Sequence, residues 1–157
     1  PIVRAMPNTP ACIGKGMTVA VANSQVSHES RKKAKDLLKT TGKFEWVEEE
    51  EMMDAVTALS GSGPAYVFYM IEMLARAGMT NGLPEDFAKT LARQTVIGAA
   101  ALAEAEPDIS PETLRENVTS PGGTTAAALR LLMDGRAQHL LNETLAEAKH
   151  RSEELSE

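Results

Sequence analysis

The segment from Ala65 to Ala77 places the strongest constraint on how this chain can fold. Large apolar side chains fill it from Tyr66 to Leu74, and its only charged residues are the (i, i+4) pair Glu72 and Arg76. A helix that is apolar around nearly its whole circumference must be buried on more than one side. A small bundle leaves too much surface exposed to cover such a helix alone, so we expect a second copy of the chain, a homodimer.

A second predicted helix follows at about residues 85–104, after Gly82-Leu83-Pro84, and Gly78 is expected to end the first one. From Val96 to Ala103 this helix carries alanine and glycine on successive turns, which lets another backbone approach closely. Ser110-Pro111-Glu112 predicts the start of a short helix. The last helix is expected at about residues 138–154, and its inward side is expected to consist of Leu140, Leu141, Leu145 and Ala148.

The first fifty residues have a different character. Residues 2–6 and 17–22 are short apolar runs typical of strands, and residues 44–47 alternate with Phe44 and Trp46 on one side. Between them, Ser27 is expected to cap a helix with a broad polar face that Gly42 ends. Pro7-Asn8-Thr9-Pro10 is expected to form an exposed loop at a strand end. This is an α/β pattern, too short for a complete doubly wound sheet.

The change from α/β to all-helical falls near Glu48-Glu49-Glu50-Glu51. Four carboxylates in a row raise the question of a metal site, but no histidine or further acid lies nearby, so we expect none. We expect them at the first turn of a helix, where negative charge is favourable, and Met52 to Val56 are expected to continue that helix to Thr57. We therefore predict an α/β domain end at residues 1–52 and an all-α domain at 53–157. Ser60-Gly61-Ser62-Gly63-Pro64 is expected to open the apolar helix and matches no nucleotide-binding motif.

The stretch Asn117-Val118-Thr119-Ser120-Pro121-Gly122-Gly123-Thr124-Thr125 is the strongest candidate for a binding site. It runs into an Ala/Leu-rich segment that favours a helix. Two glycines leave the backbone open to a ligand, and the first amides of a helix have no intrahelical partner. Together with three hydroxyls these amides predict a pocket for a small anion such as a carboxylate. The alternative is a helix with a tight N-terminal turn and no ligand.

Composition excludes several classes of function. The formal net charge of −6 argues against nucleic acid or an anionic membrane as a partner, and no apolar run reaches the ~20 residues of a membrane span. The single cysteine, Cys12, excludes an internal disulfide and fits a cytoplasmic location. No histidines share metal-ligand spacing, so no metal is expected. A first residue of Pro1 within a strand-like run suggests a piece of a longer polypeptide.

Three motifs resemble pyrroline-5-carboxylate reductases. They are Met6-Pro7-Asn8-Thr9-Pro10, the stretch from Asp54 to Tyr66, and the stretch from Asn117 to Thr125, in the family's order and at similar spacing. The resemblance implies reduction of 1-pyrroline-5-carboxylate to proline with NADH or NADPH, by a Rossmann domain followed by a helical dimerisation domain. The family's glycine-rich cofactor loop is absent from these residues. The chain therefore resembles the end of the Rossmann domain and the whole helical domain, with a site shared across the dimer.

The resemblance also implies roles for individual residues. Thr125 is expected to be catalytic, hydrogen-bonding the ring nitrogen of the substrate, either as a proton donor or, as we favour, only to orient the ring. The substrate is expected to contact Ser120, Gly122, Gly123, Thr124, Thr125, Thr57 and Val118. The cofactor is expected to contact Met6, Pro7, Asn8 and Asn117. For Thr57 a helix-ending hydroxyl is the alternative.

Two other classes of protein remain open at this stage. One is another Rossmann-type dehydrogenase acting on a hydroxy acid, but such enzymes carry a catalytic lysine in the helical part. Lys89, the only lysine between Phe44 and Lys149, lies in no motif. The other is an oligomerisation module with no activity of its own. The choice between NADH and NADPH depends on residues outside this sequence.

Overall fold

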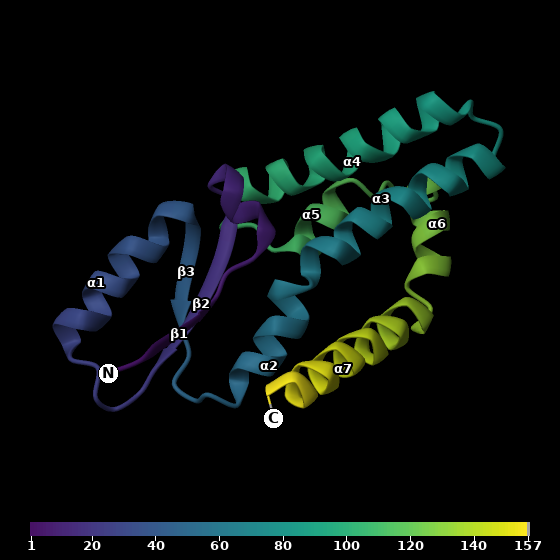
Figure 1. Ribbon diagram of the computed structural model, residues 1–157. Coiled ribbons are helices and arrows are strands. Elements are labelled where there is room, and N and C mark those ends of the chain that lie inside the picture. Colours follow the sequence, from purple (N-terminus) through teal and green to yellow (C-terminus); the bar gives the residue numbers. More distant parts are fainter. Residues whose placement is uncertain (157) are drawn as a thin grey trace. The chain divides into compact units, whose positions relative to one another are not determined.

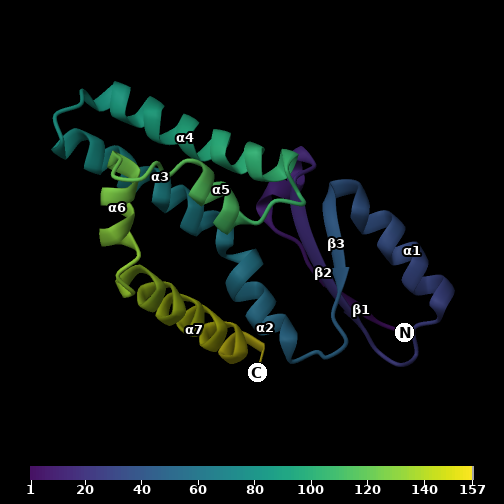
Figure 2. The same cartoon turned by 180° about the vertical axis from the view of Figure 1, so that it is seen from behind.

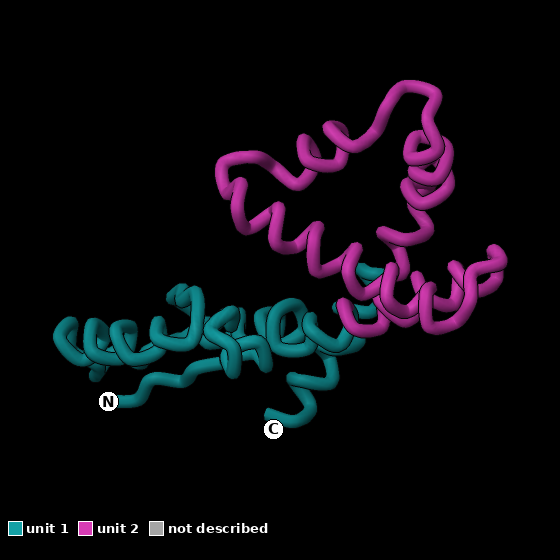
Figure 3. Tube along the Cα trace, turned by 90° about the horizontal axis from the view of Figure 1, so that it is seen from above, with its two compact units in different colours: residues 1–66, 141–157 teal, residues 67–140 magenta. Residues whose placement is uncertain are grey.

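The computed structural model describes residues 1–156, which form a small three-stranded sheet followed by helices. This agrees with the predicted α/β end of a Rossmann domain joined to an all-α part. The chain clusters into two compact units, one of residues 1–66 and 141–157 and the other of residues 67–140 (Figure 3). The domain boundary at residue 52 stays a prediction, because compactness is a different criterion from domain ancestry.

The first unit is built on the sheet β1 (Val3–Met6), β2 (Gly16–Ala22) and β3 (Gly42–Trp46), in the order β1-β2-β3 (Figure 1). β2 pairs antiparallel with β1, with Met6 opposite Val19, and parallel with β3, with Thr18 opposite Phe44. A 3-10 helix, η1 (Thr9–Ile13), joins β1 to β2 where an open loop was expected. Helix α1 (His28–Leu38) joins β2 to β3, as the parallel pairing requires.

Both faces of β2 are covered. Val19 and Val21 pack with Met53 on one face, and Met6, Met17, Val47 and Val56 surround this core. On the other face, Phe44 and Trp46 make an edge-to-face contact at 5.0 Å. Arg31 of α1 stacks over Trp46 and donates to the Ala22 carbonyl. This helix therefore covers the sheet with an arginine, consistent with its broad polar surface.

Three boundaries in this unit differ from expectation. Gly42 does not end α1, since a 3-10 turn, η2 (Lys39–Thr41), intervenes and Gly42 begins β3 with φ of 144°. A Cβ at Gly42 would lie within van der Waals overlap of Gly16, so the two strands start in close approach. Glu48–Glu50 precede α2 (Met52–Val56) instead of forming its first turn, and Glu50 pairs with Arg4.

The predicted helix entrance at residues 60–64 is instead a turn within an almost continuous helical run. Residues Thr57–Gly61 form a π-helix, η3, between α2 and α3 (Gly63–Thr80). Its signature is the hydrogen bond from the Ser62 N–H to the Thr57 carbonyl, five residues back. π-turns are rare and are often found at functional sites.

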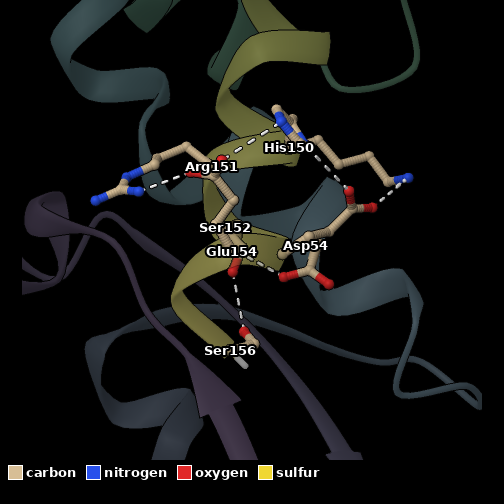
Figure 4. A network of polar contacts seen from close by, with 8 residues as sticks. Asp54, His150, Arg151, Ser152, Glu154 and Ser156 are labelled. Carbon is tan, nitrogen blue, oxygen red and sulfur yellow. Dashed lines mark hydrogen bonds and ion pairs between the residues drawn. The ribbon is translucent and has the colours of Figure 1, made fainter.

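The C-terminal part of α7 (Arg136–Ser156) also belongs to the first unit. Ser152 donates to Asp54 of α2 at 2.6 Å, a contact between residues 98 positions apart (Figure 4). His150 and Arg151 lie near Glu154 on the same helix end. This hydrogen bond fixes the last turns of the chain against the helix that follows the sheet.

The second unit is entirely helical. It contains most of α3, then α4 (Glu85–Ala105), α5 (Pro111–Asn117), α6 (Thr124–Leu132) and the start of α7. Helices α3 and α4 form an antiparallel hairpin, seen from both sides in Figures 1 and 2. Gly78 lies inside α3 instead of ending it, and a Cβ there would come within 3.3 Å of Ala88 and Leu83. The chain turns at Gly82, whose φ is 93°.

This helical unit leaves its apolar residues in contact with solvent. Only Ala75, Ala88 and Ala92 are buried among its described hydrophobic residues. Phe68, Tyr69 and Phe87 are each more than half exposed. Of the residues expected on the inward side of α7, Leu140 in this unit and Leu141 in the first unit are 64% and 47% exposed, whereas Leu145 and Ala148 are half-buried. The unit therefore has the surface expected of half of an interface.

Candidate substrate and cofactor site

The stretch from Ser120 to Gly123 is a type II β-turn that delivers the chain into α6. The Gly123 N–H donates to the Ser120 carbonyl at 3.0 Å, Pro121 occupies the second position, and Gly122 the third with φ of 71°. A Cβ at Gly122 would meet open space, so glycine is required there for its backbone conformation. The S-P-G-G sequence thus encodes this turn.

Gly123 is the N-cap of α6, with extended φ and ψ of −75° and 173°. The first intrahelical bond of α6 runs from the Ala127 N–H to the Gly123 carbonyl, so the amides of Thr124, Thr125 and Ala126 have no partner in the helix. Within residues 1–156, no side chain caps them. Three free amides at the positive end of a helix favour a carboxylate.

The residues before the turn are set by α5. Ser110 caps this helix by accepting from the Thr113 N–H, as the Ser-Pro-Glu pattern predicts. Asn117 is its last residue, and Val118 follows it, 62% exposed. The Thr119 hydroxyl donates to the Arg115 carbonyl at 2.6 Å. Asn117, Val118, Ser120 and Thr124 are all exposed, whereas Thr125 is half-buried.

The other predicted site residues belong to the first unit, where the structure brings them together. Met6 ends β1, and its sulfur would lie 3.5 Å from a Cβ on Gly61 of the π-turn. A Cβ on Gly61 would also lie 3.6 Å from Thr57. The Asn8 side chain reaches the same turn, donating to the Ser60 carbonyl at 3.1 Å. Pro7, between them, is exposed.

The two threonines expected to touch substrate differ in their hydrogen bonds. The Thr57 hydroxyl donates to the Met53 carbonyl at 2.8 Å, the helix-bonded state that was its alternative role. Its oxygen can still accept a hydrogen bond. By contrast, the Thr125 hydroxyl makes no hydrogen bond to any other residue in the described part of the chain, so it is free to donate.

Sequence reasoning included Ser60 and Tyr66 in a motif but assigned neither of them a role in this region. Tyr66 donates its hydroxyl to the Ala58 carbonyl at 3.1 Å, across the π-turn. The signal available was Pro64, which has no N–H and so leaves the Ser60 carbonyl without its i+4 donor. Among residues 1–156 no group of acidic, histidine or cysteine side chains could hold a metal ion. In the same range, no helix is long and apolar enough to cross a membrane.

Comparison with known proteins places this arrangement in a family. The family model for pyrroline-5-carboxylate reductase dimerisation matches residues 50–155. The chain belongs to this family. The matched range contains both the π-turn and the Ser120–Gly123 turn, the two local structures described above.

Curated pyrroline-5-carboxylate reductases are similar along nearly all of this chain. The Haemophilus influenzae protein is 47% identical over 147 residues, covering 94% of the chain and 53% of that protein. The Synechocystis protein is 46% identical over 154 residues, covering 98% and 57%. The chain therefore spans about half the length of the curated reductases it matches.

Solved structures give the same result. A pyrroline-5-carboxylate reductase from Coxiella burnetii superposes with a TM-score of 0.92 at 42% identity, covering 99% of this chain and 57% of that one. The Plasmodium falciparum pyrroline carboxylate reductase, solved with NADP bound, gives 0.84 at 33% identity, covering 100% and 64%. The mixed sheet and helical bundle are thus the fold of this part of a pyrroline-5-carboxylate reductase.

Proposed function

We propose that the protein reduces 1-pyrroline-5-carboxylate to L-proline with NADH or NADPH. Membership of the reductase family supports this, and the observation that carries it is the start of α6. There, a type II turn presents three unpaired amides next to a free threonine hydroxyl. A substrate with a carboxylate beside a basic ring nitrogen matches these two features.

The amides of Thr124, Thr125 and Ala126 bind the substrate carboxylate, with the Ser120 hydroxyl as a further donor. Gly122 and Gly123 allow the ligand to approach the backbone, since neither carries a Cβ. Val118, which is 62% exposed, contacts the apolar part of the ring. A hydrogen bond to a charged group is worth about 1.5–3 kcal/mol. The hydrogen bonds from these amides to the carboxylate therefore provide most of the free energy that orients the substrate.

Thr125 holds the ring nitrogen through its free hydroxyl. As C5 gains a hydride, negative charge develops on the nitrogen unless the imine is already protonated. A threonine hydroxyl is a weak acid, so its role is to orient the ring, and the proton comes from the iminium form in solution. Thr57, whose hydroxyl hydrogen is bonded to the Met53 carbonyl, is left with an oxygen that can accept a hydrogen bond from the substrate.

The residues present fit only one end of the cofactor. Met6 at the end of β1 and Pro7 directly after it offer apolar surface suited to the face of a nicotinamide ring. Asn117 is assigned to the same ligand. This sequence contains no G-x-G-x-x-G motif to hold the pyrophosphate. NAD(P)H supplies the hydride when it is bound.

The chain acts in the cytoplasm. Its helical half forms a homodimer. The exposed aromatic and aliphatic side chains of α3 and α4 support the dimer, since contiguous apolar patches beyond a few hundred Å² mark interfaces. The family's name gives the same indication.

The test is NAD(P)H oxidation by the full-length protein with two imines. It should turn over 1-pyrroline-5-carboxylate, whereas 1-pyrroline, which lacks only the carboxylate, should show kcat/KM at least about tenfold lower. Equal kcat/KM for both imines would rule out the carboxylate anchor. Reduction of NAD(P)+ by a 2-hydroxy acid, in a protein that reduces neither imine, would favour the other dehydrogenase class.

A further inference from the structure

The side chain of Asn8 uses both ends of its amide within the chain. Its Nδ2 donates to the Ser60 carbonyl at 3.1 Å, and its Oδ1 accepts from the Met17 N–H at 2.9 Å. Both bonds are partly buried. Asn8 lies in the loop expected beside the cofactor, but its polar atoms are already bonded to protein.

The Ser60 carbonyl needs this donor because of Pro64. In a regular helix the carbonyl of residue 60 would accept from the N–H of residue 64, and proline has none. A buried carbonyl left without a donor costs free energy comparable to a lost hydrogen bond. Asn8 thus replaces the missing backbone donor from a different element of the fold.

The Ala58 carbonyl, in the same turn, also receives its hydrogen bond from a side chain. The Ser62 N–H bonds to Thr57 in the π pattern, so it is not directed to its usual i+4 acceptor, the Ala58 carbonyl. Tyr66 donates its hydroxyl to that carbonyl at 3.1 Å. Two side chains, Asn8 from the loop after β1 and Tyr66 from α3, therefore supply hydrogen bonds to π-turn carbonyls that lack their usual i+4 backbone donors.

We propose that Asn8 is a positioning residue for the reductase reaction, acting through the π-turn and not by contact with the cofactor. It ties the strand-end loop to the turn that begins with Thr57, and so fixes the distance between the Met6 side and the Thr57 side of the pocket. The link to catalysis rests on the proposed function. The tether, by which we mean the two hydrogen bonds of Asn8 to Ser60 and Met17, does not rest on it.

The diagnostic substitution is Asn8→Asp. A carboxylate keeps the acceptor for Met17 but offers no donor to Ser60, and places an oxygen against the carbonyl. In the full-length enzyme kcat/KM for the imine should fall at least tenfold, while the KM for NAD(P)H should stay within about twofold. Asn23→Asp is the matched control, because the Asn23 Oδ1 only accepts from the Ile2 N–H. It should leave both parameters unchanged.

A double-mutant cycle isolates the donor role. Pro64→Ala restores a backbone N–H that can reach the Ser60 carbonyl, so Asn8→Asp should cost less in that background than in the parent protein. A residue that touches the cofactor would show no such coupling to Pro64. Additive effects of the two substitutions would overturn the proposal.

Amide hydrogen exchange on the chain itself provides a readout that needs no activity. In Asn8→Asp the Ser62 amide should exchange roughly tenfold faster, and the Met17 amide should keep its protection. In Asn8→Ala both should exchange faster. If the parent protein reduces no imine, the proposed function fails while these rates still decide the tether.

The exchange rate, kcat/KM and the KM for NAD(P)H together distinguish a positioning role of Asn8 from contact with the cofactor. Faster Ser62 exchange together with a lower kcat/KM and an unchanged NAD(P)H KM supports the positioning role. Unchanged exchange, or faster exchange with unchanged kcat/KM, overturns it. A raised NAD(P)H KM with unchanged exchange would show instead that Asn8 contacts the cofactor.

Discussion

Thr125 and Thr57 carry the same hydroxyl, but only one of the two is free to donate. The Thr57 hydrogen is bonded to Met53 within its own helix, whereas Thr125 stands in the first turn of α6 without a partner in residues 1–156. In the proposed reaction, Thr125 is therefore the threonine with a hydroxyl free to donate to the ring nitrogen. This difference depends on local backbone geometry.

Thr125→Ala should lower kcat/KM of the full-length enzyme about ten- to a hundredfold, or ~1.4–2.7 kcal/mol, if the hydroxyl orients the ring. Thr125→Ser keeps the hydroxyl and should recover most of the loss. The fold should survive both changes, since alanine is well tolerated in a first helical turn. Parent-like kinetics for Thr125→Ala would place the pocket elsewhere.

Much of the site at residue scale follows from sequence. Ser110 and Pro111 predict the start of α5, and the paired glycines predict the open entrance to α6, because caps and turns are encoded locally. The partner of Asn8 could not be predicted in this way. It lies 52 residues away, and the hydrogen bond exists only after β1 and the π-turn have folded together.

At the scale of elements, sequence predicted which segments are helices but not how they end. The π-turn was missed, because Ser60–Pro64 looks like any glycine-rich helix entrance. Gly78 was taken as a helix end, although α3 continues to Thr80. Gly78 instead allows α4 to pack closely, because Ala88 and Leu83 occupy the space that a side chain at residue 78 would need.

Gly78→Ala should therefore destabilise the protein, in spite of the higher helix propensity of alanine. The propensity gain is at most ~1 kcal/mol, while overpacking a close helix contact costs ~1–3 kcal/mol. Ala77→Ser, which adds one heavy atom at the exposed neighbouring position, should change the free energy of unfolding by less than ~0.5 kcal/mol. A thermal midpoint raised by Gly78→Ala would show that α3 and α4 can separate to accept a methyl group.

For the whole molecule, the apolar surface of the helical unit is the feature to explain. Met70 on α3 is 45% exposed, and Phe68 on the same helix is 59% exposed. A twofold-related copy would cover such residues, with more than ~2,000 Å² buried as in obligate homodimers. The sequence alone predicted this need for a partner, because the apolar helix has no polar side.

Met70→Asp should abolish the dimer and reduce solubility, as judged by sedimentation at micromolar concentration. Burying a carboxylate in an apolar interface without a partner is strongly unfavourable. Leu37→Asp is the matched control, since Leu37 is 70% exposed on α1, outside the helical unit. It should leave the dimer intact. A parent chain that sediments as a stable monomer would contradict the burial argument and the shared site with it.

The 157-residue chain by itself should not bind NAD(P)H appreciably, because it contains no G-x-G-x-x-G motif to hold the pyrophosphate. Calorimetric titration is the direct check. Micromolar affinity would mean that residues of this chain hold more of the cofactor than proposed.

Cys12 offers a practical consequence of the short 3-10 helix between Asn8 and Gly16. It is the single cysteine of the chain, it is exposed, and it lies four positions after Asn8. A maleimide fluorophore would therefore attach at one known place without any engineered mutation. On this 157-residue chain the dye would report, in real time and in a single-molecule format, whether the strand-end segment moves when an imine is added.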